Sequence, residues 1–123
     1  MTFEGLLKQE LSKIQELNDN IYPLSVPESV KAPYIAYSLV DGKYLKTLDG
    51  EEPWEFTYEI NILSSKYSDL KPLEKSVETV LRGLKGMQSD DGTVRQIDVD
   101  VPVETYEDAV KLQRANIKLT VCF

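Results

Sequence analysis

The chain has 123 residues, no histidine, one cysteine and a net charge of −7 from 21 acidic and 14 basic residues. This length favours a single domain over residues 1–123, and the lone Cys122 excludes an internal disulfide. The acidic excess disfavours direct binding to nucleic acid, because phosphates are repelled. The longest apolar runs fall far short of the ~20 residues that span a membrane, and the amino-terminal residues lack the pattern of a signal peptide.

Residues 3–17 carry apolar side chains at helical spacing, which predicts one amphipathic helix. Thr2 is the expected N-cap, and Asn18-Asp19-Asn20 is expected to end the helix. The apolar stripe consists of Phe3, Leu6, Leu7, Leu11, Ile14 and Leu17. A helix with one apolar side must pack against another element, and a sheet is the expected partner.

Two strands are predicted next. Residues 21–24 are expected to form a short edge strand, because Pro23 has no N–H to donate to a central ladder. The second strand is predicted over Tyr34 to Val40, with Pro33 favouring an extended entry. Asp41-Gly42 follows it and is typical of a hairpin turn.

Residues 41–53 are predicted to form a long loop or a protruding hairpin arm, with a short strand over 44–48. Two interpretations remain open for this segment. It is either a loose connection with a few apolar contacts to the body, or an arm that contacts another subunit. The residues that would make such a contact are Tyr44, Leu45 and Leu48, since clustered exposed apolar side chains mark interaction sites.

The most regular part of the sequence runs from Trp54 to Leu84. Apolar residues at every second position over Trp54–Leu63 predict a half-buried central strand. The spacing then changes to three and four, which predicts a helix beginning between Ser68 and Pro72, with Pro72 at its first position. Gly83, or more readily Gly86, is expected to mark its end.

The remaining chain is predicted to add two strands. Residues 86–92 read as a loop with a tight turn at Asp90-Asp91-Gly92, and residues 94–101 as an alternating strand. Residues 103–108 are expected to be a connection, and residues 109–123 a long closing strand. The apolar positions of that strand change parity near 113–116, which predicts a bulge or a bend there.

These elements predict an α+β fold in the order α-β-β-(arm)-β-α-β-β. The sheet is expected to be mostly antiparallel, with about four to six strands and two helices packed on one face.

The sequence offers little for catalysis. Without histidine the usual general base and the commonest metal ligand are missing, and Cys122 lies among alternating apolar residues as a structural thiol would. Asp98 and Asp100 share one face of a predicted strand, where a solvated surface is the commoner interpretation than a cation site. We therefore expect no enzyme activity, no catalytic or metal-binding residues and no cofactor.

The order of elements resembles the tail-completion proteins of long-tailed phages, also called tail terminators or tail-to-head joining proteins. The resemblance rests on the amino-terminal helix, the Pro33-Tyr34-Ile35 strand entry, the acidic arm containing Gly50, the aromatic strand Trp54–Leu63 and the helix that follows it. It covers nearly the whole chain and includes no catalytic motif.

The resemblance implies a phage or prophage virion protein that assembles with itself, as a ring that is typically hexameric, and terminates the tail tube. Its further partners would be the tail-tube protein and head-connector proteins, with DNA passing through an acidic channel without specific binding and with no membrane involved. The protein would be assembled in the bacterial cytoplasm and reside in the virion. The alternative is a small cytoplasmic adaptor or protein-binding module without catalytic activity.

On this hypothesis two groups of residues have roles. The expected interface residues are Tyr44, Leu45, Leu48 and Trp54, and the expected channel-facing acids are Asp49, Glu51 and Glu52.

Overall fold

The computed structural model describes residues 1–27, 29–48 and 50–123. One twisted sheet has the strand order β1-β2-β3-β8-β6, and β7 also pairs with β8. Its strands are β1 (Ile21–Pro23), β2 (Tyr34–Thr47), β3 (Gly50–Ser64), β6 (Gln96–Val99), β7 (Val103–Glu107) and β8 (Leu112–Cys122). Only the β1–β2 pair is parallel among these strands. The fold is therefore α+β with a mostly antiparallel sheet of six strands, as predicted.

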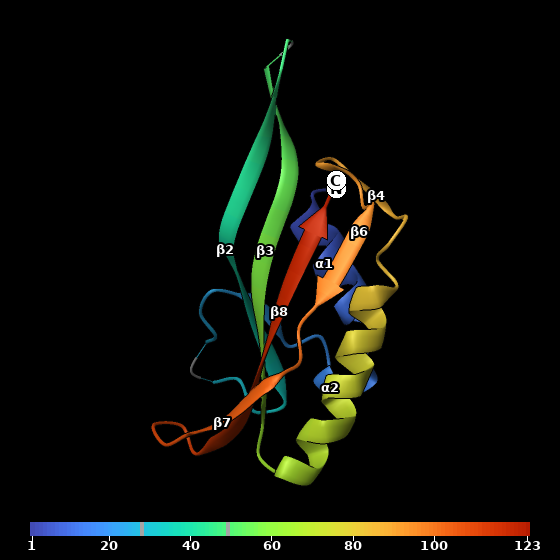
Figure 1. Cartoon of the computed structure of the whole chain (residues 1–123). Coiled ribbons are helices and arrows are strands. Elements are labelled where there is room, and N and C mark those ends of the chain that lie inside the picture. Colours follow the sequence, from blue (N-terminus) through green and yellow to red (C-terminus); the bar gives the residue numbers. More distant parts are fainter. Residues whose placement is uncertain (28, 49) are drawn as a thin grey trace.

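Two helices, α1 (Phe3–Leu11) and α2 (Tyr67–Arg82), cover one face of this sheet (Figure 1). The alternation predicted for the central strand is confirmed from Phe56 onward, because Phe56, Tyr58, Ile60 and Ile62 are all buried in the core, whereas Trp54 is 46% exposed. The other residues of the same core come from both helices, the edge strands and β8: Phe3, Leu7, Leu11, Leu70, Leu73, Val77, Leu81, Ile117 and Leu119 among them. Burial of this one cluster is the main stabilising term of the fold.

The prediction of a single helix over residues 3–17 is wrong. The helix ends at Leu11, where the Ser12 hydroxyl donates to the carbonyl of Lys8 at 2.7 Å. Such local bonds compete with helix continuation. A short 3-10 helix, η1 (Gln15–Leu17), follows. Ile14 and Leu17 remain in the core, so the apolar stripe is buried although the backbone changes course.

Asp41-Gly42 does not form the predicted turn, because it lies inside β2. The Asp41 carboxylate accepts a hydrogen bond from the Gly42 N–H at 2.9 Å, and the register shifts between Leu39 and Asp41. The Asp-Gly pair is thus accommodated as a bulge.

Helix α2 starts earlier than predicted, at Tyr67, and places Pro72 within the helix. The missing N–H of Pro72 leaves the carbonyl of Ser68 without its helical donor. Ser68 is exposed in the first turn, where water can satisfy such a group. At the other end Gly83, rather than Gly86, is the C-cap, and an ion pair joins Glu78 and Arg82 in the last turns at 3.2 Å.

The carboxyl-terminal region differs from prediction in three places. Strand β6 ends at Val99, which leaves Val101 85% exposed. Residues 103–107 form β7 rather than a connection, because they pair with the first half of β8. The register of β8 on β3 is continuous from Gln113 to Cys122, so the bulge predicted near 113–116 is absent. The parity change instead reflects the β7–β8 turn, in which Val110 is exposed.

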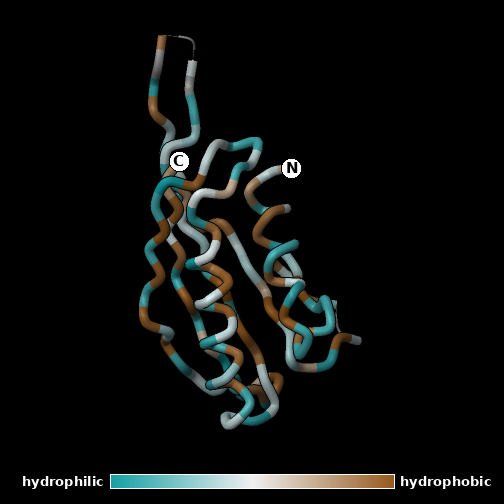
Figure 2. The backbone as a smooth tube through the Cα atoms, turned by 90° about the vertical axis from the view of Figure 1, so that its right-hand side faces the viewer, coloured by the Kyte–Doolittle hydropathy of each residue, from teal (hydrophilic) through white to brown (hydrophobic). Residues whose placement is uncertain are grey.

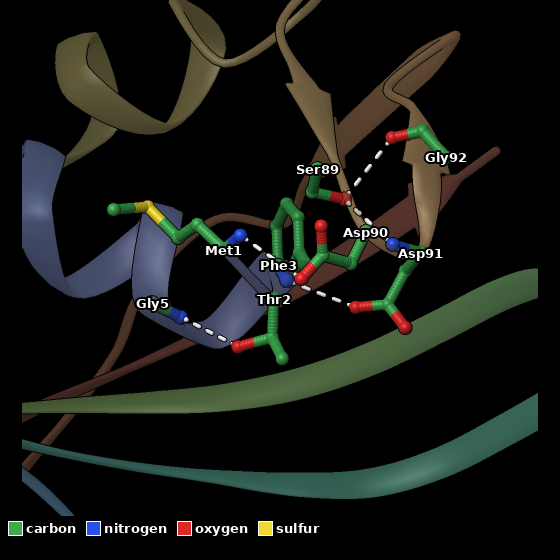
Figure 3. Close-up of polar contacts among 8 residues, drawn as sticks. All are labelled: Met1, Thr2, Phe3, Gly5, Ser89, Asp90, Asp91 and Gly92. Carbon is green, nitrogen blue, oxygen red and sulfur yellow. Dashed lines mark hydrogen bonds and ion pairs between the residues drawn. The ribbon is translucent and has the colours of Figure 1, made fainter.

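The amino-terminal turn of α1 is held by the hairpin of β4 (Gln88–Ser89) and β5 (Gly92–Thr93), shown in Figure 3. The Asp91 carboxylate accepts from the Phe3 N–H at 2.9 Å, and the Thr2 hydroxyl oxygen accepts from the Gly5 N–H at 3.2 Å. Both bonds satisfy N–H groups that have no partner within the helix. The tight turn predicted at Asp90-Asp91-Gly92 therefore also serves as a cap for α1.

We expect Asp91→Ala to lower the free energy of unfolding by about 1–2 kcal/mol, because it removes a charged acceptor at the positive end of a helix. Chemical denaturation checks this value. Asp91→Asn keeps an acceptor oxygen and should therefore lower the free energy of unfolding clearly less than Asp91→Ala does. Equal losses for the two variants would contradict a role for the acceptor.

Candidate interaction site

The segment 41–53, here called the arm, consists of the outer ends of β2 and β3. Strand β8 pairs with β3 only over Glu55–Ser64, and β1 pairs with β2 only as far as Tyr37. Beyond these points Tyr44 pairs with Pro53 and Leu45 with Glu52, and the ribbon extends past the rest of the sheet (Figure 1). A ribbon of two strands is only marginally stable alone in water, so a contact along it would stabilise the arm.

The arm and the adjoining Trp54 expose a set of apolar side chains, and Figure 2 shows hydrophobic stretches along the arm. The exposed fractions are 58% for Tyr44, 48% for Leu45, 106% for Leu48 and 46% for Trp54. Tyr44 also touches the body of the protein, with its ring edge-on to Phe56 at a centroid distance of 6.2 Å. Trp54 is the additional residue at a register shift between Lys43 and Tyr44. Exposed apolar groups clustered in this way are typical of a protein interaction surface.

Of the three acids predicted to face a channel, the structure describes the side chain of Glu52 alone. Glu52 is exposed and lies across from Leu45. Asp49 and the side chain of Glu51 lie outside the described residues. A role for the three acids in facing a channel, and a role for the four apolar residues in an interface, therefore remain predictions.

Sequence reasoning missed a pair of carboxyl groups between α2 and β7, of which Glu74 is buried and Glu104 is partly exposed. Glu74 of α2 is only 4% exposed, and Glu104 of β7 approaches it. Lys71 bonds to Glu104 at 2.9 Å and lies 3.9 Å from Glu74, and the Tyr67 hydroxyl donates to Glu104 at 3.2 Å. The helical spacing of Glu74 from Leu70 and Val77 would have placed it on the buried stripe.

The pKa values of the two carboxyl groups are shifted in opposite directions. Burial, and then the neighbouring Glu104, raises the pKa of Glu74 to about 7, which Lys71 opposes. The hydrogen bond from Lys71 lowers the pKa of Glu104 below its usual value. Each group has one buried oxygen without a partner in the described structure, so a proton on Glu74 lets the two oxygens share a hydrogen bond.

We expect stability to fall as pH rises through about 7. The folded state binds the Glu74 proton more tightly than the unfolded state, so the stabilisation is present at low pH and lost above the folded pKa. The loss between pH 6 and 8 should be on the order of 1 kcal/mol, measured by denaturation at each pH. Glu74→Gln should abolish the fall, whereas Asp69→Asn, at an exposed site of the same helix, should leave it unchanged. A fall that persists in Glu74→Gln would assign it to another group.

Of the residues considered for chemistry, Cys122 and Asp98 lie near each other on β8 and β6, but the surroundings of the thiol disfavour its reactive thiolate form. Cys122 is half-buried, and burial followed by the Glu55 carboxylate raises the pKa of its thiol. Asp98 is bonded by the amide of Gln96 at 3.2 Å, and Asp100 is exposed. No group of three or more acidic or cysteine side chains suited to a metal occurs within residues 1–27, 29–48 and 50–123. None of the helices described there is long and apolar enough to span a membrane.

No protein-family model and no curated protein matches the chain. Solved structures do match in fold. A chain in the structure of the virion of a native gene transfer agent particle is similar over 94% of this chain and 90% of its own length, with a TM-score of 0.67 and 12% sequence identity. At that identity the similarity establishes a common fold.

Proposed function

We propose that this protein is a phage or prophage virion structural protein, a subunit of a ring that terminates the tail tube and joins it to the head. The observation that carries the proposal is the similarity of nearly the whole chain to a component of a gene transfer agent virion. The order of elements that resembles tail-completion proteins gives independent support from the sequence.

The surface of the molecule suits such a role. A ring subunit needs no active site, but it needs two different surfaces that meet on neighbouring copies. In this proposal one of them consists of Tyr44, Leu45 and Leu48 of the arm and the adjoining Trp54, which are all substantially exposed. In this proposal the copies form a hexamer that contacts the tail-tube protein on one side and head-connector proteins on the other, after assembly in the bacterial cytoplasm.

The charge of the chain fits a channel through which DNA passes without binding. The net charge is −7, and three of the acids, Asp49, Glu51 and Glu52, belong to the sequence segment 41–53. Acidic groups repel phosphate and so disfavour adhesion of DNA to the channel wall.

The proposal is tested by native mass measurement over a wide concentration range, with negative-stain images of the same samples. A six-membered ring with a central hole is the expected result. A parallel test removes the gene from the phage that carries it, and unjoined heads and tails are expected. Normal joined particles without this protein would contradict the proposal and favour the adaptor alternative, which the same exposed arm could also serve.

A further inference from the structure

Strand β7 has little apolar support in the sheet. Among the described strands it pairs with β8 alone, and none of its five residues is buried. Val103 is 62% exposed and Tyr106 is 50% exposed. Segments with few buried apolar contacts open locally at a lower free energy than the core does. The polar contacts between β7 and its neighbours therefore have a large influence on how often β7 opens.

Polar contacts hold β7 on both faces of the sheet. On the face away from the helices, the Arg114 guanidinium of β8 donates to Glu107 at 2.8 Å. On the helix face, Glu104 accepts from Lys71 at 2.9 Å and from the Tyr67 hydroxyl at 3.2 Å. Both donors of α2 bond to the same oxygen of Glu104, Oε1. The other oxygen of this carboxyl group, Oε2, is left for a different neighbour.

That neighbour is the carboxyl group of Glu74, which lies within hydrogen-bonding reach of Glu104. Oε2 of each residue is covered from solvent and has no partner in the described structure. Glu74 is only 4% exposed, whereas the Glu104 side chain is 25% exposed. Two ionised carboxylates can only accept hydrogen bonds, so neither satisfies the other. One proton on the pair supplies the missing donor and joins α2 to β7.

The charged groups around this pair belong to α2 and β7. Lys71 bonds to Glu104 and lies 3.9 Å from Glu74, and Glu78 is a further acid on the same helix. Burial and the neighbouring Glu104 outweigh the opposing effect of Lys71 and raise the pKa of Glu74 to about 7. The geometry and the electrostatics therefore both favour a proton on this pair at neutral pH.

The strands under the helices present apolar side chains on the same face. These include Ile62 of β3, Val99 of β6 and Ala115 of β8, and Ala115 lies opposite Glu104 in the ladder. The basic residues of β8, Arg114 and Lys118, alternate with its buried residues and so lie on the opposite face. The carboxyl pair consequently depends on Lys71 and on its own proton for compensation of its charge.

We infer that one proton held between Glu74 and Glu104 locks β7 to α2, and that loss of this proton lets β7 detach while the other strands stay paired. This inference goes beyond the proposed function and does not depend on it. The closed strand binds the proton more tightly than the open strand, so opening is suppressed at low pH and becomes easier as the pH rises through about 7. Detachment uncovers the edge of β8 over residues 112–116.

The test is amide hydrogen exchange of the whole chain, followed by NMR between pH 6 and pH 8. Protection factors are compared, because they correct for the intrinsic rise of the exchange rate with pH. We expect the protection of the β7 amides to fall about tenfold over this range, since the proton is held near pH 7 only in the closed strand. The short edge strand β1 is the internal control, because its pairing with β2 involves neither glutamate.

Two outcomes of this experiment would overturn the inference. Protection of β7 that does not change between pH 6 and pH 8 would show that no proton controls its opening. Protection of β7 equal to that of Ile60 in the core at every pH would show that β7 opens only when the whole fold unfolds.

Glu74→Gln is the decisive variant, because its amide can donate to Glu104 at every pH, as the protonated carboxyl group does. It should keep β7 protected at pH 8 and remove the pH dependence. Asp69→Asn, at an exposed site of the same helix, should leave the tenfold fall unchanged. A fall that persists in Glu74→Gln would assign the proton to another group and reject the lock.

The proton itself can be followed without any substitution. Carbon NMR of the Glu74 side-chain carboxyl group should show a titration near pH 7, with the same midpoint as the loss of β7 protection. A titration of Glu74 in the ordinary range of an exposed glutamate would exclude the shared proton, even if β7 opened more readily at high pH.

Discussion

The double substitution Tyr44→Ser and Leu48→Ser is expected to abolish ring or tail assembly while the monomer stays folded. Apolar anchors at the centre of an interface contribute about 2 kcal/mol or more each. Loss of two of them would weaken association by roughly a thousandfold. Leu48 is fully exposed in the monomer, and Tyr44 keeps only its edge contact with Phe56. We therefore expect the free energy of unfolding to fall by no more than about 1 kcal/mol.

Native mass and negative-stain images measure assembly, and thermal unfolding checks the monomer. Val101→Ser is the matched control, because it also makes a highly exposed apolar position polar but lies on the β6–β7 connection. Assembly that survives the double substitution would show that the arm is not the interface. If the double variant were unfolded, Leu48→Ser alone would decide, since that side chain makes no buried contact.

Elements that bury a regular apolar face were predictable from the sequence. Strand β3 has apolar residues at every second position, because only that spacing buries both Phe56 and Tyr58 on one face. Helix α2 has them at every third or fourth position, because that spacing buries both Leu73 and Val77. The same reasoning found Leu48 and its neighbours on the arm, since apolar residues among acids and glycines have no place in a regular core face.

Predictions based on local signals alone were wrong where tertiary pairing outweighed them. Asp41-Gly42 has turn chemistry, but pairing with Thr57 and Phe56 of β3 keeps it in an extended strand. Residues 103–108 were predicted to be a connection, whereas the structure has a strand over 103–107. In it Val103 is exposed and Glu104 is partly buried, which inverts the usual alternation. Its pairing with β8 and the contact of Glu104 with Lys71 hold it in place.

One hollow of the surface was beyond sequence reasoning for a different reason. It is lined by Val26, Val30 and Tyr34 on one side and by Val110 and Leu112 on the other, which are distant in sequence and meet only because β2, β3 and β8 lie side by side. Each wall alone reads as an ordinary loop with a few apolar residues. The concave surface exists only after the sheet has formed.

Ile60→Ala is expected to cause the largest loss of stability, about 2–5 kcal/mol. Ile60 is fully buried in the middle of β3, between Tyr37 of β2 and Ile117 of β8. Truncation removes apolar contacts and leaves a cavity beneath the helices that the paired strands cannot close. A domain of this size has a total stability of only about 5–15 kcal/mol, so the variant could lose a large share of it.

Urea denaturation measures the effect, with an unchanged slope indicating that only stability has changed. Ile60→Val is the conservative control and should cost about 0.5–1.5 kcal/mol, because it removes one methyl group. Leu48→Ala should change stability by no more than about 0.5 kcal/mol, since its side chain is in solvent. This ordering follows from burial alone, and a loss below about 1 kcal/mol for Ile60→Ala would contradict the central position of β3 in the core. The pair Ile60 and Leu48 therefore separates the residues that make the fold from those that we assign to assembly.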